Sequence, residues 1–401
     1  MHKMKMLKSL LVFLVISSSV SAQNWIRSKD FPADARDDAA VFVIGDVAYC
    51  GSGVKPWVAL SDFYAFDMGS ESWTSIASLP PGEERQYACG FSLAEKGFIF
   101  GGYRNGEFLN DVWSYDPRSN RWTESDSLPS AGRSGSASFV IDSIAYIVGG
   151  KNDSAQALDE VWAFNMKNMQ WTQKSALSSG ESWRASGSAS DSLGYLIFGL
   201  DNKIAYQSGL YEYNPANDIW RKISDFPGQK RNYSSMQYVN GKLIVFAGMD
   251  SLGNYLNDLW SYDIVSDSWK ELDTLPAKGR RGGVGFLNGN SLYYSTGLLK
   301  NGQRLTETWK CINVTSLQEN GKDGNYKVFP NPATSNLLFE IPLGVSGAKF
   351  VRILDVKGIV VHQEEVLGQQ TDINLRNLPT GTYFLAWESK QGKFVRKFIK
   401  Q

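Results

Sequence analysis

The chain has 401 residues, of which 41 are basic and 41 acidic, so its formal net charge is +0. A neutral chain has no overall field that would attract nucleic acid or anionic lipid, and we expect neither as a partner. Its 38 glycines and an aromatic content of 13% favour many short strands joined by tight turns over long helices.

Residues 1–22 have the features of a secretory signal peptide. Lys3, Lys5 and Lys8 form a basic start, an apolar run covers residues 10–16, and small residues end the segment at Ala22. Cleavage is predicted between Ala22 and Gln23. The apolar run is too short to span a bilayer stably and no second one follows, so no transmembrane segment is expected.

Three cysteines, Cys50, Cys89 and Cys311, are scattered along the chain without a C-x-x-C spacing. An odd and sparse set excludes a disulfide-stapled scaffold. Because export leads to an oxidising compartment, one bridge is left open, but the sequence does not identify the pair.

Two columns of aromatic residues repeat at a fixed interval through most of the chain. Neighbouring members are 49 residues apart, except for one interval of 48 at the start of the first column. Because two independent columns share one period, we predict a chain of repeated units. The first column is Trp25, Trp73, Trp122, Trp171, Trp220 and Trp269, and the second is Tyr64, Trp113, Trp162, Tyr211, Trp260 and Trp309.

Each unit has the same internal order, which predicts four short strands and their turns. Two glycines end the apolar run that becomes the second strand, where the chain needs positive φ or close backbone approach. Asp or Asn stands at positions 67, 116, 165, 214 and 263, where it is expected to cap the turn into the last strand. The diglycine, followed by Tyr and Trp with six residues between them, as in Tyr115 and Trp122, resembles the kelch repeat.

This resemblance implies an all-β, six-bladed kelch β-propeller over residues 23–312, with one four-stranded blade per repeat. The first copy starts at Trp25, in a final strand, whereas the last stops at Cys311, just after a third strand. The sixth blade therefore lacks its own outer strand. We expect the segment around Trp25 to supply it, so that no sheet edge stays open at the seam. The fourth blade is the most degenerate, with Ser178 for Pro and Leu200 for the second Gly.

A polar stretch over residues 313–325 predicts a linker, and a new domain follows over residues 326–401. Its segments alternate in the manner of strands at 336–341, 349–356, 359–362, 372–375, 382–387 and 393–399, divided by Pro and Gly turns. A domain of about 75 residues with this pattern suits a small Ig-like β-sandwich.

Motifs along this domain resemble, in order, those of the type A sorting domain of type IX secretion. They are Val328-Phe329-Pro330-Asn331-Pro332-Ala333, Leu354-Asp355-Val356-Lys357-Gly358, Leu378-Pro379-Thr380-Gly381-Thr382-Tyr383 and Lys397-Phe398-Ile399-Lys400. The resemblance implies the type IX secretion machinery as a partner and a secreted or outer-surface location in a Gram-negative bacterium. The alternative is an ordinary Ig-like adhesive module, which the basic C-terminal ending disfavours.

Histidine occurs only at His2, in the leader, and at His362, in the C-terminal domain. Galactose oxidase shares the kelch architecture, but its copper site relies on two histidines, so copper oxidase activity is not expected. A Ser-His-Asp triad and a His-rich zinc site are excluded for the same reason. No phosphate-binding or dinucleotide-binding glycine motif is present. We therefore expect no cofactor and no metal.

An arginine column precedes the innermost strand of each blade. In kelch proteins this position borders the central pocket, where guanidinium groups suit carboxylates of acidic sugars or of Asp and Glu side chains. Nearby aromatic residues offer flat faces for sugar rings or cations. The candidate ligand-binding residues are Arg36, Arg85, Arg133, Arg184, Arg231, Arg280, Trp57, Tyr87, Trp183 and Tyr233.

The alternative role of these arginines is structural. Positions 62, 111, 160, 209, 258 and 307 read Asp, Asp, Glu, Gly, Asp and Glu, which is a matching set of salt-bridge partners. We expect salt bridges for most of the ring. Gly209 replaces the acid in the fourth blade, and Arg184 lies about two residues out of phase, so Arg184 is the arginine expected to be free for a ligand.

The leading functional hypothesis is a non-catalytic, exported binding module that presents one propeller face to a glycan or a protein. The enzyme alternative is a metal-independent sugar mutarotase or epimerase resembling the sialic-acid mutarotase, in which Arg, Glu and Asp do the acid–base work. A third hypothesis is a purely structural role in a surface assembly, which predicts no small-ligand pocket.

Overall fold

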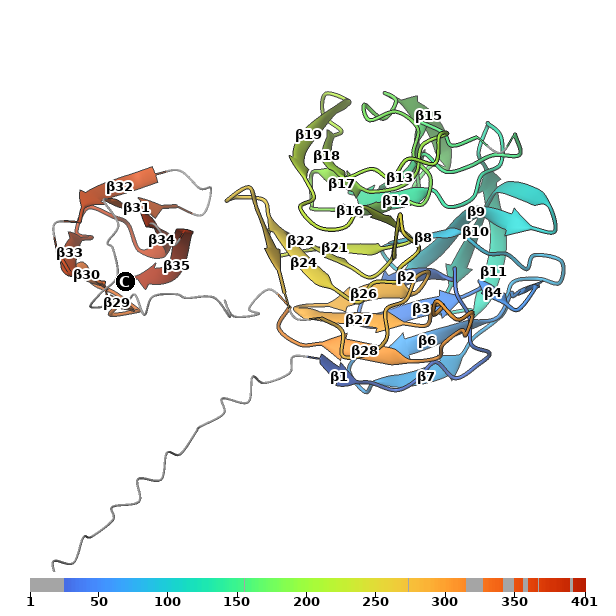
Figure 1. The fold of residues 1–401 in the computed structure, drawn as a ribbon, viewed down its shortest axis with the longest axis horizontal. Coiled ribbons are helices and arrows are strands. Elements are labelled where there is room, and N and C mark those ends of the chain that lie inside the picture. The colour runs from blue at the N-terminus through green and yellow to red at the C-terminus, as the bar shows by residue number, and fades with distance from the viewer. Residues whose placement is uncertain are drawn as a thin grey trace, which may run out of the picture.

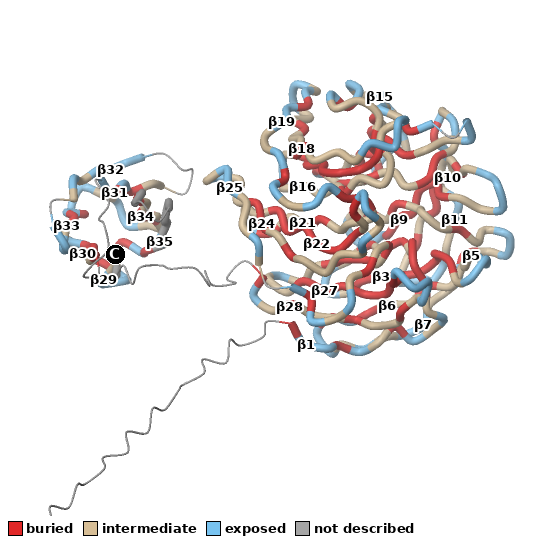
Figure 2. Tube along the Cα trace, viewed as in Figure 1, coloured by how far each residue is buried: buried red, intermediate tan, exposed pale blue. Residues whose placement is uncertain are grey.

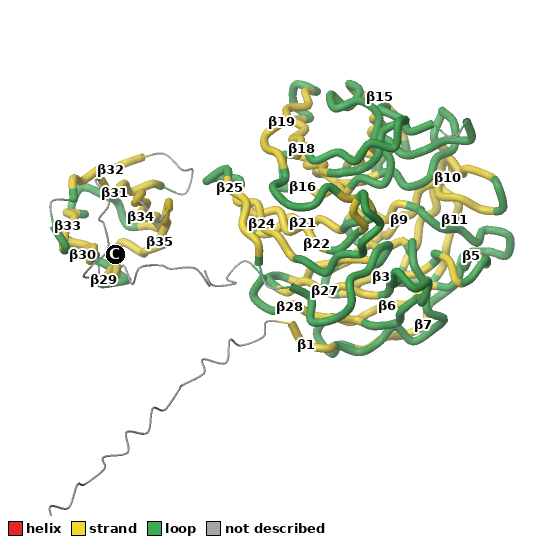
Figure 3. Tube along the Cα trace, viewed as in Figure 1, coloured by secondary structure: helices red, strands yellow, loops and turns green. Residues whose placement is uncertain are grey.

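The computed structural model describes residues 25–314, except 155 and 273, and residues 327–341, 350–355, 360–366, 368–389 and 392–401. The signal peptide, its predicted cleavage site at Ala22 and Gln23, and most of the predicted linker lie outside these ranges. Throughout the described ranges the chain forms strands and loops (Figure 3), so the predicted all-β class is confirmed. No described segment is a helix of the length and apolarity needed to cross a membrane.

Residues 25–314, as described, form six four-stranded antiparallel sheets, which we call blades 1 to 6 in chain order (Figure 1). Blade 1 contains β2 (Ala40–Ile44), β3 (Val47–Gly51), β6 (Phe63–Asp67) and β7 (Ser72–Ser75), and blade 2 contains β8 (Cys89–Leu93), β9 (Lys96–Arg104), β10 (Glu107–Asp116) and β11 (Arg121–Ser127). Blade 3 contains β12 (Ala137–Ile141), β13 (Ile144–Val148), β14 (Val161–Asn165) and β15 (Gln170–Lys174), and blade 4 contains β16 (Ser186–Ala189), β17 (Gly194–Ile197), β18 (Gly209–Asn214) and β19 (Ile219–Asp225). Blade 5 contains β21 (Ser235–Val239), β22 (Lys242–Phe246), β24 (Leu259–Asp263) and β25 (Ser268–Glu271), and blade 6 contains β26 (Val284–Asn288), β27 (Ser291–Ser295), β28 (Thr308–Cys311) and β1 (Trp25–Arg27). Short strands β4 (Val54–Lys55), β5 (Val58–Ala59), β20 (Arg231–Asn232) and β23 (Met249–Asp250) lie in the loops.

The blades stand in a closed ring around one axis. The first strand of each blade contacts the first strand of the next, from β2 through β8, β12, β16 and β21 to β26, and β26 contacts β2 again. Aromatic residues pack one blade on the next: the Trp122 ring of blade 2 lies 4.7 Å from the Phe63 ring of blade 1. Figure 2 shows the buried residues following the strands and the exposed ones at the loops. The tryptophan columns thus form the core between blades.

The ring closes through the N-terminal strand, as predicted. Strand β1 pairs antiparallel with β28, with Trp25 opposite Cys311 and Arg27 opposite Trp309. Figure 1 shows this blue strand beside the orange end of the propeller. Trp25 is buried in the blade 6 core, so the seam has both ladder hydrogen bonds and apolar packing.

The repeated Asp and Asn residues cap turns as expected. Asp67 Oδ1 accepts hydrogen bonds from the backbone N–H groups of Gly69 and Ser70, and Asp116 and Asn214 make the equivalent bonds to residues two positions later. Each hairpin between third and fourth strands is therefore closed by its own side chain.

All three cysteines are buried, and no disulfide joins any two of them. Burial raises the pKa of the Cys50 and Cys89 thiols to about 12. Thiols of this kind are weak nucleophiles at neutral pH. Their role is to fill the blade cores.

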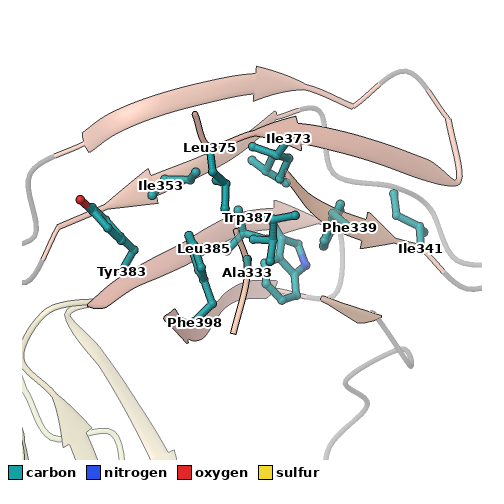
Figure 4. Packing of buried hydrophobic residues seen from close by; sticks show 12 residues of the cluster. Ala333, Phe339, Ile341, Ile353, Ile373, Leu375, Tyr383, Leu385, Trp387 and Phe398 are labelled. Atoms are coloured by element: carbon teal, nitrogen blue, oxygen red, sulfur yellow. The ribbon is translucent and has the colours of Figure 1, made fainter. Parts of the chain in front are cut away.

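The C-terminal domain consists of two sheets that enclose one core. One contains β29 (Lys327–Phe329), β30 (Asn336–Glu340) and β33 (Gln370–Asn374), and the other β32 (Val360–Glu365), β31 (Phe350–Leu354), β34 (Gly381–Ser389) and β35 (Gly392–Lys400). Figure 4 shows Phe339, Ile373, Leu385 and Trp387 meeting between the sheets.

Two of the motifs in this domain meet in space. The Ala333 N–H donates to the Ile399 carbonyl, and the Gln401 N–H donates to the Ala333 carbonyl. The Ile399 N–H in turn donates to Asn331 Oδ1. The Pro-Asn-Pro segment therefore holds the C-terminal strand. At the same end of the sheet, the Tyr383 hydroxyl donates to the Pro379 carbonyl and fixes the start of β34.

Candidate functional site

Five arginines of the predicted column are fully buried and each is paired with the predicted acid. The shortest distances between guanidinium nitrogen and carboxylate oxygen run from 2.5 to 2.8 Å, for Arg36–Asp62, Arg85–Asp111, Arg133–Glu160, Arg231–Asp258 and Arg280–Glu307. Arg85 Nη1 also donates to the Gly101 carbonyl in β9 (3.3 Å). These arginines tie each blade's entry loop to its second and third strands, and this geometry favours their structural role.

The pairs differ between blades because the acid differs. Arg85 donates two hydrogen bonds to Asp111, from Nη1 and Nη2, whereas Arg133 donates one to Glu160, from Nη2. Arg133 Nη1 and Arg280 Nη1 are buried and lack a hydrogen-bond partner among the described residues. The extra methylene of glutamate thus replaces a two-point contact with a one-point contact.

Blade 4 lacks the whole arrangement. The residue in phase with the arginine column is Ser182, whose hydroxyl donates to the Phe198 carbonyl (3.4 Å). A Cβ on Gly209 would lie 2.5 Å from the Tyr211 ring, so that ring fills the space in which other blades hold the acid. Arg184 therefore does not belong to the arginine column, because it lies two positions after Ser182.

Arg184 instead belongs to a second column, two residues later, that surrounds the axis. We call these the axial residues: Asp38, Tyr87, Gly135, Arg184, Tyr233 and Gly282. All six have φ between 55° and 64°. Backbone hydrogen bonds link them from blade to blade, from Tyr87 N to Asp38 O, Gly135 N to Tyr87 O, Arg184 N to Gly135 O and Asp38 N to Gly282 O, at 2.8–3.1 Å. This belt explains why residues other than glycine adopt the left-handed conformation here.

The axial side chains meet across the ring. The hydroxyls of Tyr87 in blade 2 and Tyr233 in blade 5 lie 3.3 Å apart, although these blades are opposite each other. Arg184 Nη2 donates to the Tyr87 hydroxyl (3.2 Å). Its guanidinium carbon lies 3.6 Å from the Trp183 ring centre and 3.9 Å from that of Tyr233. Arg184 Nε and Trp183 Nε1 are buried without a hydrogen-bond partner among the described residues.

A buried carboxyl faces these cations. Burial and the neighbouring Asp37 together raise the pKa of Asp38 to about 8, although Arg281 and Arg184 act in the opposite direction. Asp38 is therefore largely protonated at neutral pH, and its charge does not cancel that of the two arginines.

The mouth of the axial cluster carries two more cations. Arg304 Nε lies 2.6 Å from Asp37 Oδ1, and Arg281 Nε donates to the Tyr255 hydroxyl (3.0 Å). Arg281 Nη1 is 3.9 Å from Asp37 and has no hydrogen-bond partner among the described residues. The side chains of Arg281 and Arg304 are 17% and 18% exposed, so both can be reached from solvent. An open hollow of about 340 Å³ is lined by Tyr255, which accepts the hydrogen bond from Arg281, and by Lys278 and Lys300 among others.

The structure thus divides the predicted site residues into three groups. Tyr87, Trp183, Arg184 and Tyr233 come together at the axis, and the other five arginines are buried beside it. Trp57 lies apart, 99% exposed in the turn between β4 and β5. Sequence reasoning missed Asp38, Asp37, Arg281, Arg304 and Tyr255. Asp38 could have been found from the repeat, because it stands at the position of its unit that is equivalent to Tyr87 and Arg184 in theirs.

Metal chemistry finds no support in this part of the molecule. Over the described ranges, no group of three or more His, Cys, Asp or Glu side chains is arranged to hold a metal ion. The chemistry that the axial cluster offers is that of guanidinium groups, phenols and a protonated carboxyl.

Comparisons with known proteins agree with the fold. Residues 2–198 match the family described as KLHDC2/KLHL20/DRC7 Kelch-repeats domain, residues 230–276 match the Kelch motif, and residues 327–401 match the Secretion system C-terminal sorting domain. A solved structure titled "Structure of YjhT" has a TM-score of 0.62 and 19% identity, covering 70% of this chain and 96% of that chain, and supports the fold alone. No curated protein matches the chain.

The sorting domain indicates secretion or cell-surface attachment in Bacteroidetes-type bacteria. The chain is therefore an exported kelch-repeat β-propeller protein with a C-terminal sorting domain of type IX secretion.

Proposed function

We propose that the protein is a binding module whose axial cluster takes a ligand bearing a carboxylate, either an acidic sugar or an acidic side chain of a protein. The observation that carries this proposal is that Arg184 and Arg281 each keep a buried N–H group without a hydrogen-bond partner among the described residues. Arg133 and Arg280 of the structural column also keep such a group, but they pair with Glu160 and Glu307 at 2.8 and 2.6 Å, whereas the carboxylates nearest to Arg281 Nη1 lie 3.9–4.0 Å away.

The chemistry of the cluster fits such a ligand. A guanidinium presents parallel N–H groups that match the two oxygens of a carboxylate, and the match is strongest where water is excluded. Trp183 and Tyr233 hold the Arg184 plane by stacking, so little ordering remains to be done when the ligand binds. Because Asp38 is largely protonated, it can donate a hydrogen bond instead of repelling an anion.

Calorimetry on the full secreted protein tests this proposal with galacturonate and its neutral counterpart galactose. We expect galacturonate to bind, and galactose to bind at least about tenfold more weakly, a difference of about 1.4 kcal/mol. Arg184→Ala and Arg281→Ala should each lower the affinity for galacturonate by a similar factor. Arg221→Ala is the matched control, because Arg221 pairs with Glu212 on the outer strands of blade 4. Equal affinity for the two sugars would contradict the proposal.

A second candidate function is sugar mutarotation, and the observation that favours it is the buried carboxyl of Asp38. A carboxyl with a pKa of about 8, buried beside arginines and a tyrosine, can give or take a proton near neutral pH. The protonated carboxyl would give its O–H proton to the ring oxygen while its carbonyl oxygen accepts the proton of the anomeric hydroxyl, so that the C1–O5 bond breaks, an open-chain carbonyl forms, Asp38 stays neutral and the ring recloses on either face.

Exchange spectroscopy by NMR decides this second candidate. Wild-type protein should speed the anomerisation of galacturonate above the buffer rate, and Asp38→Asn should return it to that rate while binding persists. An unchanged rate with bound sugar would rule out mutarotation of this sugar and leave the binding proposal intact.

A further inference from the structure

Each blade has a short antiparallel ladder at the mouth of the axial cluster. We call its first member the entry residue, which directly precedes the axial residue of the blade, and its last member the outer residue. One central residue pairs with both of them. In chain order the entry and outer residues are Asp37 and Ala59, Gln86 and Phe108, Ser134 and Ala157, Trp183 and Tyr206, Asn232 and Tyr255, and Arg281 and Arg304.

Hydrogen bonds between these residues join some neighbouring blades. Arg281 Nε, in the entry residue of blade 6, donates to the hydroxyl of Tyr255, the outer residue of blade 5 (3.0 Å). Arg304 Nε, in the outer residue of blade 6, donates to Oδ1 of Asp37, the entry residue of blade 1 (2.6 Å). Three other boundaries cannot form such a bond, because their outer residues are apolar. These are Ala59, Phe108 and Ala157.

The boundary between blades 4 and 5 has a polar residue on each side, Tyr206 and Asn232, but no bond joins them. Asn232 is fully buried, and neither its Oδ1 nor its Nδ2 atom has a hydrogen-bond partner among the described residues. Because both atoms lack a partner, this holds whichever way the amide is turned. Buried side-chain amides are nearly always hydrogen-bonded, so the position is built for a polar group from outside the chain.

Both residues lie close to the proposed carboxylate site. Tyr233, which directly follows Asn232, has its ring centre 3.9 Å from the guanidinium carbon of Arg184 and 4.2 Å from that of Arg281. Burial and then Asp250 raise the pKa of Tyr206, whereas Arg184 and Arg281 act in the opposite direction. The phenol of Tyr206 is thus within electrostatic reach of the same two cations.

We propose that Asn232 and Tyr206 bind hydroxyl groups of the ligand, which makes the ligand a sugar acid and not an acidic side chain of a protein. This inference rests on the carboxylate site proposed at Arg184 and Arg281. A carboxylate only accepts hydrogen bonds, so it cannot satisfy Asn232 Oδ1. Hydroxyls both donate and accept, and two of them on neighbouring ring carbons satisfy both ends of the amide.

The burial of Asn232 sets the route by which these hydroxyls reach it. They must enter between Asn232 and the side chains that cover it. By the repeat, Tyr206 is the residue of blade 4 that reaches toward Asn232, as Tyr255 reaches Arg281. Tyr206 is half-buried and follows the exposed residues 202–205, so its side chain can turn outward without opening the core. After the ligand enters, the Tyr206 hydroxyl can close on it.

Calorimetry with two carboxylates tests the proposal on the full secreted protein. Galacturonate carries ring hydroxyls, whereas cyclohexanecarboxylate has a six-membered ring and a carboxylate but no hydroxyl. We expect cyclohexanecarboxylate to bind at least about tenfold more weakly, because it leaves the buried amide unpaired. Equal affinity for the two would overturn this inference and leave the proposed carboxylate site standing. Binding of neither would contradict both.

Variants then assign the discrimination to the two residues. Asn232→Leu should lower the affinity for galacturonate at least about tenfold and leave that for cyclohexanecarboxylate within about twofold, whereas Arg281→Ala should weaken both. Tyr206→Phe, at a half-exposed position, should weaken galacturonate alone. Ser134→Ala, at the equivalent entry position of blade 3, is the matched control and should change neither affinity. Unchanged galacturonate binding in both Asn232→Leu and Tyr206→Phe would overturn the proposal, because ordered water would then be all that the amide binds.

Thermal unfolding without sugar separates this role from a structural one. Leucine has nearly the shape of asparagine and no polar group to leave unpaired, so Asn232→Leu should keep the melting temperature or raise it. A clear fall in the melting temperature would show that the amide stabilises the fold itself, and would overturn the proposal.

Discussion

Blade 4 and the other five blades solve the same packing problem in different ways. In five blades a buried arginine pairs with an acid, and the Trp or Tyr of the third strand follows that acid two positions later. Blade 4 has Ser182, Gly209 and Tyr211 at these three positions. The blade without the pair is also the one whose axial residue is an arginine. A repeated fold can therefore keep its charges neutralised in most units and leave one cation at the axis available for other contacts.

The largest effect is expected from breaking a pair in one of the five regular blades. Arg85→Ala would remove the donor of the Gly101 carbonyl and both arginine donors of Asp111, which would keep only the Trp113 indole N–H, and we expect a loss of about 3–5 kcal/mol in the free energy of unfolding. Ser182→Ala, at the same position of blade 4, should cost under about 1 kcal/mol. Urea denaturation of both variants measures the difference, and similar losses would show that blade 4 holds an equivalent pair.

The axial carboxyl gives the molecule a pH dependence opposite in sign to that of the salt-bridged Glu160 and Glu307, whose pKa values are lowered. Native Asp38 keeps its proton up to about pH 8, whereas an unfolded aspartate loses it near pH 3.9. Since the native state binds more protons in this window, stability should fall as pH rises, by at most about 1.4 kcal/mol per pH unit. Asp38→Asn should remove this slope between pH 5 and 8 in thermal unfolding. A slope that persists in the variant would assign it to another group.

Replacing the axial arginine by lysine sharpens the comparison at the site itself. Arg184→Lys keeps the positive charge but removes the planar group that stacks between Trp183 and Tyr233. We expect a loss of about 1 kcal/mol in stability. A change of near zero would indicate that charge alone matters at this position. Chemical denaturation gives the measurement, with the exposed Arg221→Lys as control.

The smallest effect concerns the two kinds of acid among the regular blades. Glu160→Asp should let both Nη atoms of Arg133 find the carboxylate, as they do in blade 2, and raise stability by up to about 1 kcal/mol. Asp111→Glu should have the opposite sign. If both exchanges destabilise, the surrounding backbone has adapted to each acid.

Much of the fold was predictable because it is periodic. The interval of 49 residues between tryptophans placed the strands, and the missing outer strand of the last unit led directly to the pairing of Trp25 with Cys311. The salt bridges between arginines and acids were also predictable, because residues equivalent to Arg36 and Asp62 recur together in the other regular units. Arg184 was the exception. It was predicted as a member of the arginine column, although it lies two positions after the residue of blade 4 that is in phase with that column.

The sequence by itself determined the repeat, the ring and the arginine–acid pairs, because each depends on residues of one unit or its neighbour, at spacings that recur. Only the tertiary structure decided which side chains meet at the axis, since Tyr87 and Tyr233 are 146 residues apart and touch only when opposite blades face each other. It also decided that Trp57 lies apart from Trp183, because the exposure of a loop tip depends on what the rest of the ring leaves uncovered.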